Sequence, residues 1–159
     1  MSEYLNEEIR KLKESKNAII LAHYYQVPEV QDAADFVGDS FELSRRAKEN
    51  DADLIVFCGV RFMAESAKIL SPNKKVLLPV KEAGCPMADM AAAQQIIDMK
   101  KEHPNAKVVT YVNSSVEAKA VSDVCCTSSN AIRIVKNIDA EEIIFAPVSY
   151  THLTLPTKA

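Results

Sequence analysis

Short apolar runs alternate with amphipathic stretches along the chain, and this alternation restricts the possible folds most strongly. AIILAH at 18–23 is apolar on successive residues, which is typical of a strand buried on both faces of a parallel sheet. Strands that alternate with helices favour an α/β fold with parallel sheets. Strands are expected at 18–23, 54–59, 74–80, 107–113 and 141–147, with a further short strand within 123–130.

Helices are expected between these strands. Leu5, Ile9 and Leu12 lie on one face of an amphipathic helix at 3–15. Residues 30–49 are expected to form a helix that Gly38 could interrupt. Further helices are expected at 61–71, 88–102, 115–122 and 130–137.

The pattern restarts in the second half of the chain. Residues 18–49 are echoed at 107–121, and residues 54–70 are echoed at 123–137. We therefore expect repeated three-layer α/β/α units. The first domain is expected at 1–87 and an incomplete second domain at 88–147.

Charge and cysteine usage exclude several classes of protein. The net charge is −3 and the pI is about 5.6, so nothing attracts the chain to nucleic acid or to an anionic membrane. A charged N-terminus and the lack of an apolar run of about 18 residues argue against a signal peptide and a membrane span. We expect a cytoplasmic protein whose four cysteines are not in disulfides.

Polar residues follow the expected strands, where ligands bind in parallel α/β sheets. His23 could act as a general acid or base, or it could be a satisfied histidine at a strand end. Of Tyr24 and Tyr25, one is expected to face a ligand and the other the core. Ser40 lies at the possible interruption near Gly38, and Ser128 lies near an expected helix start. At a helix N-terminus a serine hydroxyl binds an anion or caps the helix.

Cys85 lies between Gly84 and Pro86 in a loop without apolar neighbours. This setting suits an exposed metal ligand better than a core residue. The chain has no CxxC spacing, so the other ligands of a metal centre would have to come from elsewhere. Cys58, Cys125 and Cys126 are expected to be buried small side chains.

Several long segments together resemble the quinolinate synthase family, in matching order and spacing, from about residue 4 to Pro147. The segments are ILAHYYQVPEVQDAADFVGDSFELSRRA, VFCGVRFMAESAKIL, PVKEAGCPMADM, VTYVNSSVEAKAVSDVCCTSSNA and EEIIFAP.

The resemblance implies a transferase with three similar α/β/α domains, of which this chain holds the first one and a half to two. The family condenses iminosuccinate with dihydroxyacetone phosphate to give quinolinate in NAD biosynthesis, and an aspartate oxidase that makes iminosuccinate is an expected partner. A 4Fe-4S cluster, held by one cysteine from each domain, acts as a Lewis acid.

Residue by residue, the resemblance implies that Cys85 is one cluster ligand. It places Tyr25 in proton transfer and His23 both there and in substrate binding. The further substrate-binding residues that it implies are Ser40, Tyr111, Val112, Asn113 and Ser128.

The chain departs from the family near its end. Two more cluster cysteines are expected beyond residue 147, and the final VSYTHLTLPTKA does not resemble the family, so 148–159 is expected to be a non-native tail. We expect the fragment to be inactive alone. The alternatives are a non-catalytic α/β binding or structural unit and an unrelated phosphate-binding α/β enzyme with a reactive Cys85.

Overall fold

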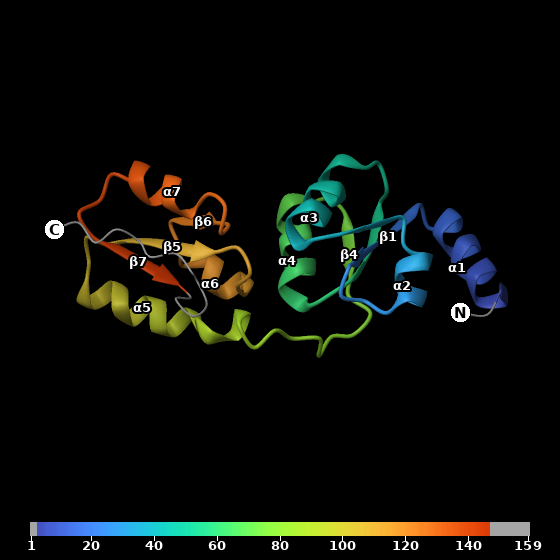
Figure 1. Ribbon diagram of the computed structural model, residues 1–159, viewed down its shortest axis with the longest axis horizontal. Helices are drawn as coiled ribbons and strands as arrows, with labels where there is room; N and C mark the ends of the chain where they lie inside the picture. Colours follow the sequence, from blue (N-terminus) through green and yellow to red (C-terminus); the bar gives the residue numbers. More distant parts are fainter. Residues whose placement is uncertain (1–2, 147–159) are drawn as a thin grey trace. The chain divides into compact units, whose positions relative to one another are not determined.

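The computed structural model describes residues 3–146. The chain divides into two compact units, Met1–Gly84 and Cys85–Ala159, and each is described by itself (Figure 1). The domain limits expected at 1–87 and 88–147 stay predictions, and the expected tail lies outside the described residues.

The first unit is a four-stranded sheet in the order β2-β1-β3-β4. Every neighbouring pair in it is parallel, as the continuous apolar runs predict. Its elements are α1 (Glu3–Ser15), β1 (Ala18–His23), α2 (Pro28–Ala33), β2 (Phe36–Gly38), α3 (Ser40–Glu49), β3 (Leu54–Cys58), α4 (Arg61–Leu70) and β4 (Lys75–Leu77).

The segment expected as one helix at 30–49 is two helices with a strand between them. Pro28 suits the first turn of α2, because its missing N–H has no partner there. Asp39 caps α3 by accepting a hydrogen bond from the Glu42 amide at 2.8 Å. The three residues of β2 were too short a run to give a strand pattern of their own.

The two faces of this sheet are covered differently. On one face, α3 and α4 contact each other (Figure 1) and bury Leu43 and Phe62. On the other, α1 and α2 leave an apolar cavity of about 440 Å³ against the sheet. The lining includes Ile9, Val30 and Val56, and α1 has no buried residue.

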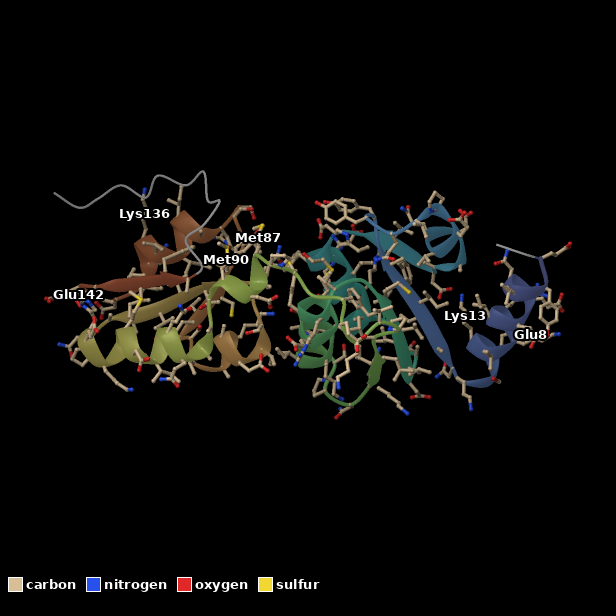
Figure 2. The ribbon with its side chains drawn as sticks, turned by 90° about the horizontal axis from the view of Figure 1, so that it is seen from below. Glu8, Lys13, Met87, Met90, Lys136 and Glu142 are labelled. Carbon is tan, nitrogen blue, oxygen red and sulfur yellow. The ribbon has the colours of Figure 1, made fainter. Side chains whose placement is uncertain are left out.

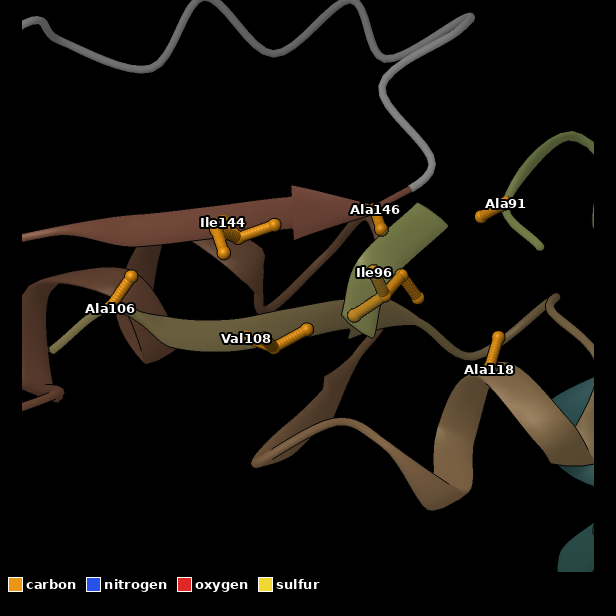
Figure 3. Packing of buried hydrophobic residues seen from close by; sticks show 7 residues of the cluster. All are labelled: Ala91, Ile96, Ala106, Val108, Ala118, Ile144 and Ala146. Carbon is orange, nitrogen blue, oxygen red and sulfur yellow. The ribbon is translucent and has the colours of Figure 1, made fainter. Parts of the chain in front are cut away.

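The second unit is a three-stranded parallel sheet, among its described residues, in the order β6-β5-β7. Buried aliphatic side chains line one face of it, with Val108 and Ile144 from the sheet and Ile96 from α5 (Figure 3). The elements are a 3₁₀ turn η1 (Ala88–Met90), α5 (Ala93–Glu102), β5 (Lys107–Tyr111), α6 (Val116–Ala120), β6 (Val124–Cys126), α7 (Ala131–Asn137) and β7 (Ile143–Ala146).

The two sheets repeat one register. Adding 88 to the pair Leu21–Phe36 gives the pair Val109–Val124, and adding it to Leu21–Phe57 gives Val109–Phe145. Residues 123–137 therefore correspond to 35–49, and the expected echo of 54–70 at 123–137 is wrong. The error arose because β2 was read as part of a helix.

The same correspondence explains the cavity in the first unit. Ile96 of α5 is 2% exposed and fills the matching space in the second unit (Figure 3). Its counterpart by number in α1 is Glu8, which instead pairs with Lys11 at 3.3 Å. Because a charged side chain is costly to bury, α1 does not fill its sheet face as α5 does.

One aspartate in each unit joins the start of the outer strand to the central strand. Asp35 accepts a hydrogen bond from the Ile20 amide at 2.7 Å and pairs with Lys13, which Figure 2 labels on α1, at 2.5 Å. Asp123 accepts from the Val108 amide at 2.9 Å. That bond, with Lys100 and Lys107, lowers the pKa of the Asp123 carboxyl.

We predict that Asp123→Ala lowers the free energy of unfolding by about 1–3 kcal/mol, because the Val108 amide loses its acceptor. Val108 is fully buried, so water cannot readily replace the carboxylate. Urea unfolding followed by circular dichroism measures the change.

The matched control is Asp98→Ala, which removes only exposed contacts with Gln94 and Lys101 and is expected to change stability little. Equal losses from both substitutions would contradict the role assigned to Asp123.

Candidate active site

His23 is the last residue of β1 and is only 4% exposed. Its Nδ1 accepts a hydrogen bond from the Tyr25 amide at 3.2 Å. Burial lowers the pKa of the imidazole, and the nearby Asp39 carboxylate opposes that shift in part. The structure therefore favours a neutral imidazole at the carboxyl end of the central strand.

Tyr24 and Tyr25 follow His23 in a tight turn. They are 50% and 78% exposed, so the expectation that one of them faces the core is wrong. The imidazole lies 4.4 Å from each phenol ring, between centroids, and the ring of Tyr24 is stacked on it. A hydrogen bond with the Tyr25 side chain raises the pKa of the Tyr24 phenol. The turn gathers three protic side chains.

Ser40 begins α3, immediately after the strand that pairs with β1. His23 pairs with Gly38 in the parallel strand register. Ser40 therefore lies two residues after the backbone partner of His23. The helix cap is Asp39 rather than Ser40. Ser40 is therefore not the capping residue, and as a half-buried residue at this strand end it remains a candidate for ligand binding.

The second unit places its predicted residues at the same positions of its sheet. Tyr111 pairs with Cys126 as His23 pairs with Gly38, and Ser128 follows Cys126 as Ser40 follows Gly38. The Val112 amide donates to the Cys126 carbonyl at 2.8 Å. Asn113 follows in the same half-buried turn.

Ser128 is exposed in the loop before α7. The Thr127 amide donates to Asn130 Oδ1 at 2.7 Å, and the hydroxyls of Thr127 and Ser129 lie 2.9 Å apart. These neighbours organise the loop around Ser128. The helix expected to begin near Ser128 begins at Ala131 in the structure.

Cys85 is half-buried at the start of the second unit. The Asp89 amide donates to its carbonyl at 3.1 Å, and Met87 and Met90 of the same segment, labelled in Figure 2, are both partly exposed. Within residues 3–146, no three His, Cys, Asp or Glu side chains are grouped to hold a metal ion. The described donors therefore do not by themselves fit an iron–sulfur cluster.

Burial acts against metal binding by two of the other cysteines. Burial raises the pKa of Cys126 to about 11 and also raises that of Cys58, so both favour the thiol over the metal-binding thiolate. Cys126 is buried as expected, whereas Cys125 is exposed and Cys58 is half-buried.

Sequence reasoning missed the residues that hold this turn and these strands. Gln31 bonds to the backbone on either side of Tyr25, and Asp35 and Asp123 bond to central-strand amides three residues before His23 and Tyr111. The signal for the aspartates was available, because each directly precedes a short apolar stretch of the outer strand. Gln31 had no such signal.

These features define a repeated parallel α/β protein with candidate ligand-binding residues at the carboxyl ends of its strands. The family model described as Quinolinate synthetase A protein matches residues 7–153. The chain belongs to this family. The match continues past Pro147 into the segment expected to be a non-native tail.

Curated relatives support the assignment. The chain is 65% identical to a quinolinate synthase of Clostridium acetobutylicum over 99% of its own length and 54% of that protein. It is 57% identical to a quinolinate synthase of Aquifex aeolicus over 90% of its own length and 44% of that protein. The chain thus spans about half the length of the curated relatives it matches.

Helices in the described part of the chain are too short or too polar to cross a membrane.

We predict that His23 makes the protein less stable in mild acid. The folded-state pKa of His23 lies below its ordinary value of 6.5, so the unfolded chain binds the proton more readily. The contribution of His23 to the free energy of unfolding is therefore fully present above about pH 6.5. It is lost as the pH falls through the folded-state pKa. Urea unfolding at a series of pH values measures it.

His23→Asn, which keeps an acceptor for the Tyr25 amide, should show a smaller loss between about pH 7 and about pH 5. His103→Asn is the control, because His103 is an exposed residue paired with Glu142. If the free energy of unfolding falls as much in His23→Asn as in the unsubstituted chain between about pH 7 and about pH 5, the prediction is contradicted.

Proposed function

We propose that this chain is part of a quinolinate synthase and acts in NAD biosynthesis. The observation that carries the proposal is the arrangement of the candidate residues. His23 and Ser40 in one unit, and Tyr111 and Ser128 in the other, occupy matching positions at the carboxyl ends of parallel strands. Proteins named quinolinate synthase share this sequence at high identity.

The proposed substrates are iminosuccinate and dihydroxyacetone phosphate, which condense to quinolinate. Ser40 in the first unit, and Asn113 and Ser128 in the second, each supply a donor suited to a carboxylate. The Val112 amide already donates to the Cys126 carbonyl. The phenol of Tyr111 adds a further donor at the end of β5.

His23 and Tyr25 are the proposed proton-transfer groups. A mainly neutral imidazole can donate or accept at neutral pH, and the phenol of Tyr25 lies against it. The same turn leaves the Tyr25 ring 78% exposed, where a substrate could reach it. We propose that Tyr25 exchanges protons with the condensation product and that His23 donates or accepts a proton beside it.

Cys85 is the proposed cluster ligand of this chain. A 4Fe-4S cluster would supply Lewis-acid assistance to the loss of a hydroxyl group as water. Because the described residues do not provide a full ligand set, we propose that its other cysteines belong to the part of the family sequence that this chain lacks. The chain alone is then inactive, since one thiolate cannot hold the cluster.

The test uses a chimera in which residues 1–146 replace the matching half of the Clostridium acetobutylicum relative. After anaerobic reconstitution with iron and sulfide, we expect the chimera to form quinolinate from iminosuccinate and dihydroxyacetone phosphate. The 159-residue chain alone should form none. Quinolinate is measured by chromatography.

Cys85→Ala in the chimera should abolish both activity and the cluster absorption, whereas Cys125→Ala should keep both. A folded but inactive chimera would overturn the proposed function. Turnover by the chain alone would overturn its proposed inactivity, and a cluster retained in Cys85→Ala would overturn the ligand assignment.

A further inference from the structure

Gln31 of α2 connects to both sides of the turn that carries the candidate acid–base residues. Its side-chain nitrogen Nε2 donates to the Tyr24 carbonyl at 3.1 Å and to the Gln26 carbonyl at 2.7 Å. Tyr25 lies between these two residues. One carboxamide therefore bridges the backbone on either side of Tyr25.

The turn that Gln31 bridges determines which hydrogen bonds His23 makes. The Gln26 amide donates to the His23 carbonyl at 2.9 Å, and the Tyr25 amide donates to His23 Nδ1 at 3.2 Å. A backbone N–H can only donate, so Nδ1 must be the unprotonated nitrogen of the ring. In a neutral imidazole the proton is then on Nε2.

The surroundings of His23 favour its neutral form. Only in the neutral form does the imidazole have a defined tautomer. The side chain is 4% exposed, and both neighbouring phenol rings lie 4.4 Å from it. The charged group that faces it is Asp39, at the start of α3. Burial outweighs the attraction of that carboxylate, since the net shift of the His23 pKa is downward.

We propose that Gln31 is a positioning residue that locks His23 as the Nε2–H tautomer and thus as a hydrogen-bond donor to a substrate oxygen. The substrate in this statement rests on the proposed function. The tautomer and its dependence on Gln31 do not.

Both hydrogens of the Gln31 carboxamide are used by the turn, which distinguishes this residue from an ordinary helix side chain. The α2 helix is closed independently, because the Ala34 amide donates to the backbone carbonyl of Gln31. A substitution of the Gln31 side chain can therefore open the turn without removing that closing bond.

The experiment measures the tautomer and the pKa of His23 in this chain by long-range proton–nitrogen NMR across a pH series. In the unsubstituted chain we expect protonated Nε2 and unprotonated Nδ1 at neutral pH. Gln31→Glu places a carboxylate against two carbonyls, and Gln31→Met removes the donor without adding charge.

In both variants, the chemical shifts of the two ring nitrogens of His23 should move toward the averaged values of mixed tautomers. The pKa of His23 should rise toward 6.5. Gln95→Glu is the matched control. Gln95 uses its oxygen, as the acceptor of the Ala92 amide, and glutamate keeps that oxygen. It should leave the His23 signals unchanged.

Protonated Nδ1 in the unsubstituted chain would overturn the proposal. So would unchanged His23 signals in both Gln31 variants. Loss of the circular dichroism signal in both would make Gln31 a structural residue and would also overturn it. Because none of these readouts needs turnover, an inactive chimera would count against the proposed function and leave this inference intact.

Discussion

The hydrogen bond from a central-strand amide to the aspartate that directly precedes the neighbouring strand is the interaction on which both units depend. Asp35 receives it from Ile20, and Asp123 receives it from Val108. The aspartate amides return a bond to the carbonyls of the same two residues at 2.8 Å and 2.9 Å. This double connection sets the register of short strands that side-chain packing alone would specify weakly.

The register then determines what lies at the other end of the strands. The same spacing that aligns β1 with β2 brings His23 beside Gly38, two residues before Ser40, and in the second unit it brings Tyr111 beside Cys126. The two units use this frame differently. The first supplies a buried imidazole with two exposed phenols, and the second supplies amide and hydroxyl groups, which suit proton transfer and anion binding respectively.

The parallel α/β class and most strands were predictable from the sequence, because buried parallel strands are continuous apolar runs. The strand Phe36–Gly38 was not, since three residues show no periodicity and its pairing depends on Asp35. The group of polar side chains at the end of β1 was also predictable, and its role as a site stays a prediction. The roles of Asp39 and Gln31 were not, because they depend on hydrogen bonds made in the folded turn.

The central claim is that the carboxyl ends of these strands bind a dicarboxylate. An isotope-labelled sample of the chain titrated with malate, a stable dicarboxylate, tests it most directly by NMR, with acetate at matched ionic strength as the reference. The account predicts saturable shifts of the amide signals of Ser40, Asn113 and Ser128. Shifts confined to the lysines of α1, or equal shifts with acetate, would contradict it.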